Sequence, residues 1–256
     1  MKKTLLGTVG LLALGFATSA SAADLAARPY TKAPPAMIAA VYDWSGFYIG
    51  INGGGGSSHK CWTNTNTLGV PTIPSVSEGC HDASGGMAGG QIGFRWQSAN
   101  WVFGVEGQGD WADLKSSNAS LFIPGATNQS KIDALGLITG QVGYAWNNVL
   151  WYVKGGAAVT ADKYNGFLTG TGIAFDQARE TRWGGAVGTG LEVGFAQNWS
   201  VGVEYDHLFM GSRSLNFTST VAPAGTSSRV DSIKQDVDMA TVRVNYRWGG
   251  PVVAKY

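Results

Sequence analysis

Hydrophobic and polar side chains alternate along several short runs of this chain, a pattern typical of β-strands that have one apolar face. Three of these runs repeat one another at a spacing of about 50 residues. They are Gln91–Phe94, Gln141–Tyr144 and Glu192–Phe195. Each passes through a short turn into a second alternating run, at Trp101–Glu106, Val149–Lys154 and Trp199–Glu204. The pattern therefore predicts three β-hairpins with tight turns.

Two further alternating runs, Phe47–Ile51 and Val242–Trp248, have no partner within the repeat. Together with the three hairpins they predict eight strands. Long segments rich in Ser, Thr, Asn and Gly separate the predicted strands, at 57–86, 114–130, 162–181 and 211–231. Short turns at one rim and long loops at the other are typical of outer-membrane barrels, whose short turns are periplasmic. We expect an all-β fold: an eight-stranded antiparallel transmembrane β-barrel with short periplasmic turns and four long extracellular loops.

The apolar face of these runs is rich in aromatic side chains close to the predicted turns, as in the belt that marks a membrane–water interface. The predicted aromatic girdle consists of Phe94, Trp96, Trp101, Tyr144, Trp146, Phe195, Trp199, Tyr246 and Trp248. A second girdle is predicted to begin at Trp111, Trp183 and Phe209. A soluble β-sandwich would alternate in the same way. Its core is less often this aromatic at the strand ends, and the 38 glycines of the chain also favour the barrel.

The opposite face of the predicted strands carries charged side chains. Eight strands leave a lumen that side chains fill, and an unpaired charge buried there costs several kcal/mol. We therefore expect three glutamates to pair with two cations in a lumen ionic network of Glu106, Lys154, Glu192, Glu204 and Arg243. Arg95 and Arg247 are closer to the predicted periplasmic rim, where we expect solvent around them. The alternative role of this layer is to gate a narrow ion path.

The chain begins with the features of a secretory signal peptide. Two lysines precede an apolar run from Leu5 to Ala17, and Ala20–Ala22 fits a cleavage site. No later stretch has the length and apolarity of a transmembrane helix. We expect export through the inner membrane to the bacterial outer membrane. The expected segments are a signal peptide at 1–22, a proline-containing periplasmic linker at 23–43, the barrel at 44–248 and a C-terminal extension at 249–256.

Export also bears on Cys61 and Cys80, the two cysteines of the chain, because an oxidising compartment allows them to form a disulfide. That disulfide would bring His59 and His81 near one another, which suggests a weak metal or haem contact. Solvated loop histidines are the simpler interpretation, and we expect neither a metal nor a cofactor.

Composition and motifs exclude other classes of function. The net charge of +1 offers no basic face for nucleic acid. Asp206 and His207 are adjacent in a predicted strand, so they point to opposite faces and do not form a catalytic dyad. No other Ser, His or acidic constellation can be assembled at the outer rim, and we expect no catalytic residues and no enzymatic activity.

Three segments resemble a known family. Ala23–Pro35, Trp44–Gly50 and Val242–Trp248 are similar to small outer-membrane immunogenic proteins of Gram-negative bacteria, which belong with opacity-like surface antigens and OmpA-type barrels. The resemblance implies an abundant envelope protein with an eight-stranded barrel, immunogenic loops and no conserved enzymatic site. Such barrels commonly finish on an aromatic residue that the insertion machinery reads. Here Gly249–Tyr256 follow Trp248, so either that signal tolerates an extension or Tyr256 replaces Trp248.

These observations favour a non-enzymatic structural barrel that contributes to envelope integrity and displays surface loops. One alternative is a narrow porin-like pore for ions or small solutes, and another is adhesion or ligand binding through the loops. The expected partners are outer-membrane lipid and lipopolysaccharide, and the barrel-insertion machinery during biogenesis. Any extracellular ligand of the loops is unknown from the sequence.

Overall fold

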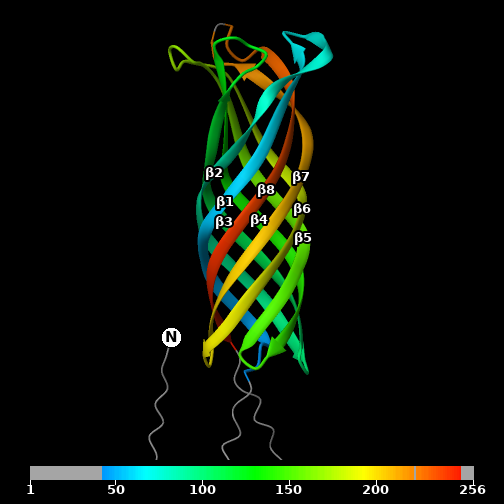
Figure 1. Ribbon diagram of the computed structural model, residues 1–256, viewed down its shortest axis with the longest axis vertical. Coiled ribbons are helices and arrows are strands. Elements are labelled where there is room, and N and C mark those ends of the chain that lie inside the picture. Colours follow the sequence, from blue (N-terminus) through cyan, green and yellow to red (C-terminus); the bar gives the residue numbers. More distant parts are fainter. Residues whose placement is uncertain (1–41, 222, 249–256) are drawn as a thin grey trace, which may run out of the picture. The chain divides into compact units, whose positions relative to one another are not determined.

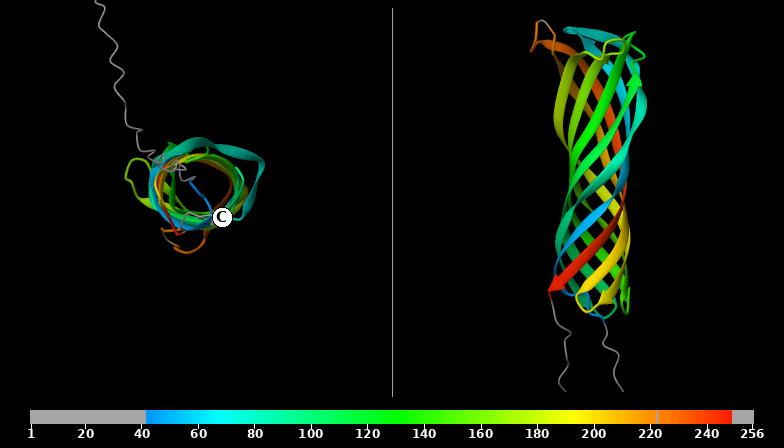
Figure 2. Two further views of the ribbon diagram at one scale, coloured as in Figure 1. Left: turned by 90° about the horizontal axis from the view of Figure 1, so that it is seen from below. Right: turned by 90° about the vertical axis from the view of Figure 1, so that its left-hand side faces the viewer.

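A computed structural model describes residues 42–221 and 223–248, which form a closed barrel of eight antiparallel strands (Figures 1 and 2). The strands are β1 (Gly46–Thr67), β2 (Val70–Ser98), β3 (Trp101–Ala119), β4 (Ala126–Trp146), β5 (Val149–Leu168), β6 (Ala174–Ala196), β7 (Trp199–Ser219) and β8 (Ser227–Trp248). The predicted signal peptide, most of the predicted linker and the C-terminal extension lie outside the described residues.

Each strand pairs with its two neighbours in sequence, and β1 closes the ring by pairing with β8 from Phe47↔Trp248 to Thr67↔Arg229. Seen along its axis, the barrel is a closed ring of strands (Figure 2). Closure gives every strand two neighbours, although the β2–β3 ladder ends at Ser84↔Lys115 and the β6–β7 ladder is interrupted between Gln177 and Gly185. The predicted eight-stranded antiparallel barrel is confirmed. Within the described residues, no helix has the length and the hydropathy needed to cross a bilayer.

Alternate residues of each strand face the lumen and the exterior, as the period of two requires. At the end with the short turns, the exterior positions are apolar over a stretch that we call the apolar band. It runs from Trp101 to Trp111 on β3 and from Trp248 to Ala240 on β8, a length that matches the roughly 9–11 residues of a transmembrane strand. Large side chains in the band are exposed, including Ile138 at 68% and Trp111 at 80%.

The strands continue far beyond the apolar band, which corrects the prediction of four long loops. Their lengths range from 19 residues in β3 to 29 residues in β2. Most of the segments 57–86, 114–130, 162–181 and 211–231 is strand, and the connections at this end are confined to 68–69, 120–125, 169–173 and 220–226. The prediction was wrong because it recognised strands by their apolar outer face, and strands whose exterior faces water do not need one. We call this second half of the barrel the extension.

The Cys61–Cys80 disulfide joins directly paired residues of β1 and β2 within the extension. It therefore cross-links two neighbouring strands and does not close an irregular loop. The tip of the same hairpin is a tight turn at Leu68 and Gly69, both with positive φ, as the most compact hairpin turns require. In the chain-entropy picture such a cross-link contributes about 3 kcal/mol by restricting the unfolded chain.

We predict that the extension resists proteolysis except at its tips. Proteinase K added to the folded barrel should cut within 68–69, 120–125, 169–173 and 220–226, because these segments connect the strands and lie outside them. Replacing both cysteines with serine should speed cleavage in β1 and β2 and leave fragments from β7 and β8 unchanged. Mass spectrometry of the fragments makes the test, and rapid cleavage throughout 57–86 of the unaltered protein would contradict the strand assignment.

Candidate functional site

The inward-facing residues of the apolar-band region form the candidate site. Its frame is a Tyr–Gly–Glu arrangement across three neighbouring strands. Tyr48 on β1 pairs in register with Gly93 on β2, which pairs with Glu106 on β3. The tyrosine ring lies over the glycine, where any Cβ would collide with it. The ring thereby reaches across β2, and its hydroxyl donates to Glu106 Oε2 at 2.6 Å.

The same arrangement recurs four strands away around the barrel. Tyr152 on β5 lies over Gly190 on β6 and donates its hydroxyl to Glu204 on β7. Both tyrosines are buried. Neither tyrosine is among the residues predicted for the lumen, although the signal was present: each is adjacent in its strand to an outward-facing residue, Phe47 or Trp151, and so has the inward parity.

Two cations lie between the two glutamates. Lys154 Nζ is 2.7 Å from Glu204 and 3.5 Å from Glu106. Arg243 Nη2 is 3.0 Å from Glu106, and its Nη1 contacts Glu204. Asp206 adds a further carboxylate 3.3 Å from Lys154. All of these side chains are at most 1% exposed, so water does not screen their charges, and each must be balanced by a neighbour.

Glu192 belongs to a separate pair nearer the short turns. Its carboxylate is 2.9 Å from Arg95, accepts a hydrogen bond from Asn245 at 2.9 Å and contacts the Ser200 hydroxyl. The expectation that Glu192 pairs with Lys154 or Arg243 was therefore wrong. So was solvation of Arg95, which is 2% exposed and lies over the Tyr48 ring at 4.4 Å.

Arg247 is also buried, at 7% exposed, rather than solvated. It donates to the backbone oxygens of Ser45 and Gln197, at 2.8 and 3.2 Å. Burial of both rim arginines has one cause. The segment just before β1 covers this end of the lumen, where Trp44 is 1% exposed and packs with Val102, Ala145, Leu150 and Tyr152.

An apolar layer closes the lumen on the other side of the charged cluster. Along β8 the inward positions run from Arg243 through Thr241 to Met239 and Val237. These last two join a packed cluster that draws on seven strands. Its members are Met87, Leu114, Ile132, Leu135, Leu137, Ala158, Ala186, Leu208, Met210, Val237 and Met239. This layer was not predicted because all of its residues lie outside the short alternating runs from which the strands were inferred, and Leu114 falls in a segment predicted to be a loop.

A second ionic cluster fills the lumen of the extension. Arg229 is 2.6 Å from Glu78, 2.9 Å from Asp176 and 3.3 Å from Asp231, and all four side chains are at most 1% exposed. Three carboxylates therefore surround one guanidinium. Burial raises the pKa of Asp231 to about 7 despite the opposing effect of Arg229, and burial also raises the pKa of Asp176. Both shifts favour the protonated carboxyl, which lessens the excess negative charge around Arg229.

The two histidines beside the disulfide lie on opposite faces of the barrel wall. His59 faces the exterior, where Nδ1 is 2.6 Å from Asp82, whereas His81 faces the lumen and contacts Asn118 and Ser130 at 2.7 and 2.9 Å. The expectation that the disulfide brings the two histidines together was wrong, because paired strands send neighbouring positions to opposite faces.

Asp206 and His207 also lie on opposite faces. Asp206 is buried in the lumen, and His207 contacts Asp238 on the exterior at 2.7 Å. The sequence analysis placed them in the same way.

The nine predicted girdle aromatics lie near the short turns and face the exterior. Their rings contact one another across neighbouring strands, as in Trp101–Tyr144 and Trp199–Tyr246, with centroids 5.5 and 5.0 Å apart. Trp111, Trp183 and Phe209 lie at the opposite border of the apolar band and are at least half exposed.

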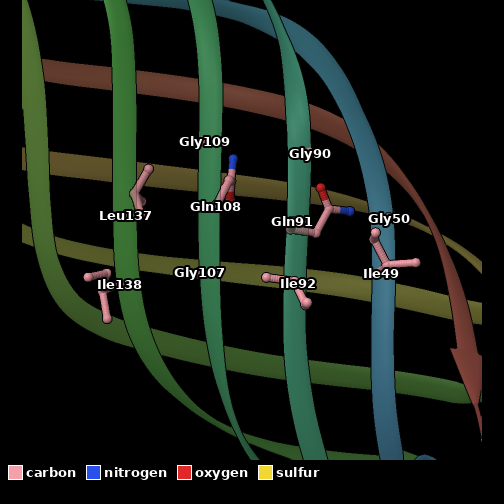
Figure 3. A pocket seen from close by; sticks show the side chains of 10 residues that line it. All are labelled: Ile49, Gly50, Gly90, Gln91, Ile92, Gly107, Gln108, Gly109, Leu137 and Ile138. Carbon is pink, nitrogen blue, oxygen red and sulfur yellow. The ribbon is translucent and has the colours of Figure 1, made fainter.

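A shallow groove of about 490 Å³ crosses the exterior of the apolar band (Figure 3). Ile49, Ile92 and Ile138 surround a stretch of neighbouring strands where Gly107 and Gly109 carry no side chain. A Cβ at either glycine would point into open space. These glycines are therefore not required by packing, and the groove offers a smooth apolar surface.

Comparison with known proteins shows to which family the chain belongs. A family model described as an outer membrane protein beta-barrel domain matches residues 9–248. The chain belongs to this family. The 31 kDa outer-membrane immunogenic protein of Brucella melitensis is 30% identical over 227 residues, covering 84% of this chain and 90% of the relative. The 25 kDa outer-membrane immunogenic protein of Brucella abortus is 28% identical, covering 88% of this chain and 90% of the relative.

The outer membrane protease OmpT from Escherichia coli has a similar fold, with a TM-score of 0.51, 8% sequence identity, and coverage of 79% of this chain and 97% of that chain. At this identity the likeness concerns the fold alone. As a member of the outer-membrane barrel family, the protein is located in the outer membrane, and its apolar band spans the bilayer. Short turns of such barrels are periplasmic, so we expect the extension to stand outside the cell.

We predict strong energetic coupling between Glu204 and Arg243. Glu204→Gln should lose about 3–5 kcal/mol of unfolding free energy, because it removes a buried carboxylate that contacts both Lys154 and Arg243. The double variant with Arg243→Gln should lose less unfolding free energy than the sum of the losses in the two single variants. The measurement is a double-mutant cycle by urea unfolding in lipid vesicles, followed by tryptophan fluorescence. The exposed Asp113–Lys115 pair, at 2.9 Å, is the control, with an expected coupling of about 0–1 kcal/mol.

We predict that mild acid stabilises the extension. Because the pKa of Asp231 is raised in the folded state, the folded chain binds this proton more tightly than the unfolded chain does. The free energy of unfolding should therefore rise as the pH falls from 8 through about 7 toward 4. Hydrogen exchange of β8 amides, corrected for intrinsic rates, measures this.

Asp231→Asn should slow exchange at pH 8 and remove most of the pH dependence, whereas Asp236→Asn on the exterior should change neither. A protein whose extension opens more readily at pH 5 than at pH 8 would contradict the assignment.

Proposed function

We propose that this protein is a non-enzymatic structural barrel that contributes to envelope integrity and displays the extension at the cell surface. The observation that carries the proposal is the packed lumen. The Glu106–Lys154 cluster is followed by the apolar layer, and the Arg229 cluster fills the lumen farther out. Side chains of complementary charge and shape occupy the places that water would fill in a pore.

The lumen residues are better suited to holding the barrel together than to moving ions. A conducting path needs binding that is weak enough to release the ion. Here Lys154 and Arg243 are already paired with buried carboxylates, and Leu208 and Met239 in the next layer are at most 1% exposed. Removing water from these groups rigidifies the wall between the two membrane interfaces, which is what an envelope protein requires.

Display at the cell surface is the second part of the proposal. The extension presents polar exterior faces and four short tips, and the Brucella relatives are named as immunogenic. Partners would be the surrounding outer-leaflet lipid and, during biogenesis, the barrel-insertion machinery. A small ligand bound inside the extension is disfavoured by the buried Arg229 cluster, which occupies its lumen.

We predict that the folded protein does not conduct. Refolded protein in planar bilayers should show no steady openings, and Lys154→Gln should leave it silent because the apolar layer still closes the lumen. A heat-shifted gel band verifies that each sample contains folded barrel. Lys163→Gln on the exterior is the matched control. Steady openings that change with Lys154→Gln but not with Lys163→Gln would favour the narrow pore and overturn the proposal.

A further inference from the structure

Four cations lie side by side on the exterior of the extension, in direct cross-strand register. Lys115 pairs with Lys131, Lys131 with Lys163, and Lys163 with Arg179, across β3, β4, β5 and β6. We call these four residues the cationic row. Like charges directly opposite each other in a sheet are destabilising, so the row needs anions to balance it.

The protein itself supplies only part of that balance. Asp113 is 2.9 Å from Lys115 and 3.2 Å from Lys131. Asp133 is 2.9 Å from Lys131 and 2.5 Å from Lys163. Two carboxylates are thus shared among three lysines as ion-pair partners.

Arg179 is exposed and has no ion pair among the described residues. A shallow pocket of about 240 Å³ lies beside it and Lys163, and three carboxylates that are already paired, those of Asp133, Asp162 and Glu180, also line it. An external anion would complete the balance there.

The height of the row on the barrel indicates where that anion comes from. The last exterior residues of the apolar band are Trp111 on β3 and Trp183 on β6. Lys115 and Arg179 follow them by two exterior positions on the same strands. At about 3.3 Å per residue and a tilt of about 45°, the row stands roughly 10 Å beyond the hydrocarbon border. That is the depth of lipid headgroups.

The apolar groove of Figure 3 lies nearer the short turns and shares β3 and β4 with the row. It includes Gly107 and Gly109 of β3 and Ile138 of β4, the strands that carry Lys115 and Lys131. A smooth apolar surface beneath a cationic one fits a molecule with acyl chains and a phosphorylated headgroup. Lysines act as point charges toward phosphate, and an arginine presents a planar fork that binds two phosphate oxygens at once.

We propose that the cationic row is a binding site for the phosphate groups of an outer-leaflet phosphoglycolipid. Asp113 and Asp133 hold the lysine side chains in place, and phosphate oxygens bridge Lys131, Lys163 and Arg179. The site fixes the barrel to its lipid neighbours on the β3–β6 side. It depends on the outer-membrane location of the protein and not on whether the lumen is closed.

The test measures retention of a diphosphorylated glycolipid by the refolded barrel in detergent, using native mass spectrometry. The triple variant Lys131→Gln, Lys163→Gln, Arg179→Gln should bind about tenfold more weakly or worse, since several charge-assisted contacts are lost. Lys163→Gln alone should show a smaller loss. Lys234→Gln is its matched control, because Lys234 is an exposed exterior cation of β8 that pairs with Cys61 and Ser212 rather than with other cations. A heat-shifted gel band verifies folding of every variant.

Two further arms identify the ligand. The same glycolipid stripped of its phosphates should bind the unaltered protein about as weakly as the intact lipid binds the triple variant. Rising salt concentration should weaken the binding of the intact lipid to the unaltered protein. Millimolar inorganic phosphate should not displace it, because the free ion lacks the acyl chains. Equal retention by the triple variant, or equal binding of the stripped lipid, overturns the proposal. Displacement by inorganic phosphate overturns the lipid assignment in favour of a free-anion site.

Discussion

The hydrogen-bond ladder between β1 and β8 is the constraint on which the rest of the structure depends. It closes the sheet at eight strands, and this number fixes a lumen that only side chains can fill. The inward side chains are therefore largely packed against one another or paired. Three kinds of contact fill this narrow lumen. They are the tyrosine rings over Gly93 and Gly190, the cations between Glu106 and Glu204, and the apolar layer next to them.

Charge is handled differently inside and outside the barrel. In the lumen, buried carboxylates and cations balance one another at close range, because water is excluded and an unpaired charge is costly. On the exterior of the extension, the cationic row is balanced only in part by Asp113 and Asp133. The difference is informative, since a surface facing solvent and headgroups can draw its counter-charge from outside the protein.

The two halves of the barrel share one set of strands but meet different surroundings. In the apolar band the exterior is aromatic and aliphatic, and in the extension it is polar. The inside changes much less, with apolar and charged layers following one another along the whole length. A continuous core of this kind holds the strands together beyond the membrane, including where the β6–β7 ladder is interrupted between Gln177 and Gly185.

The sequence by itself determined the strand number, the parity of the faces and the family, because alternation and the hairpin repeat are local signals. It placed Glu106, Lys154, Glu204 and Arg243 on the inner face, and their contacts follow from the narrow lumen. It assigned the wrong partner to Glu192 and mistook most of the extension for loops.

Only the tertiary structure decided those points. Which strand lies opposite another across the lumen depends on closure and register, so the Arg95–Glu192 pair leaves no local trace. Likewise, strands with polar exteriors are stabilised by partners far away in the chain, as Arg229 is by Glu78, and composition alone does not reveal them.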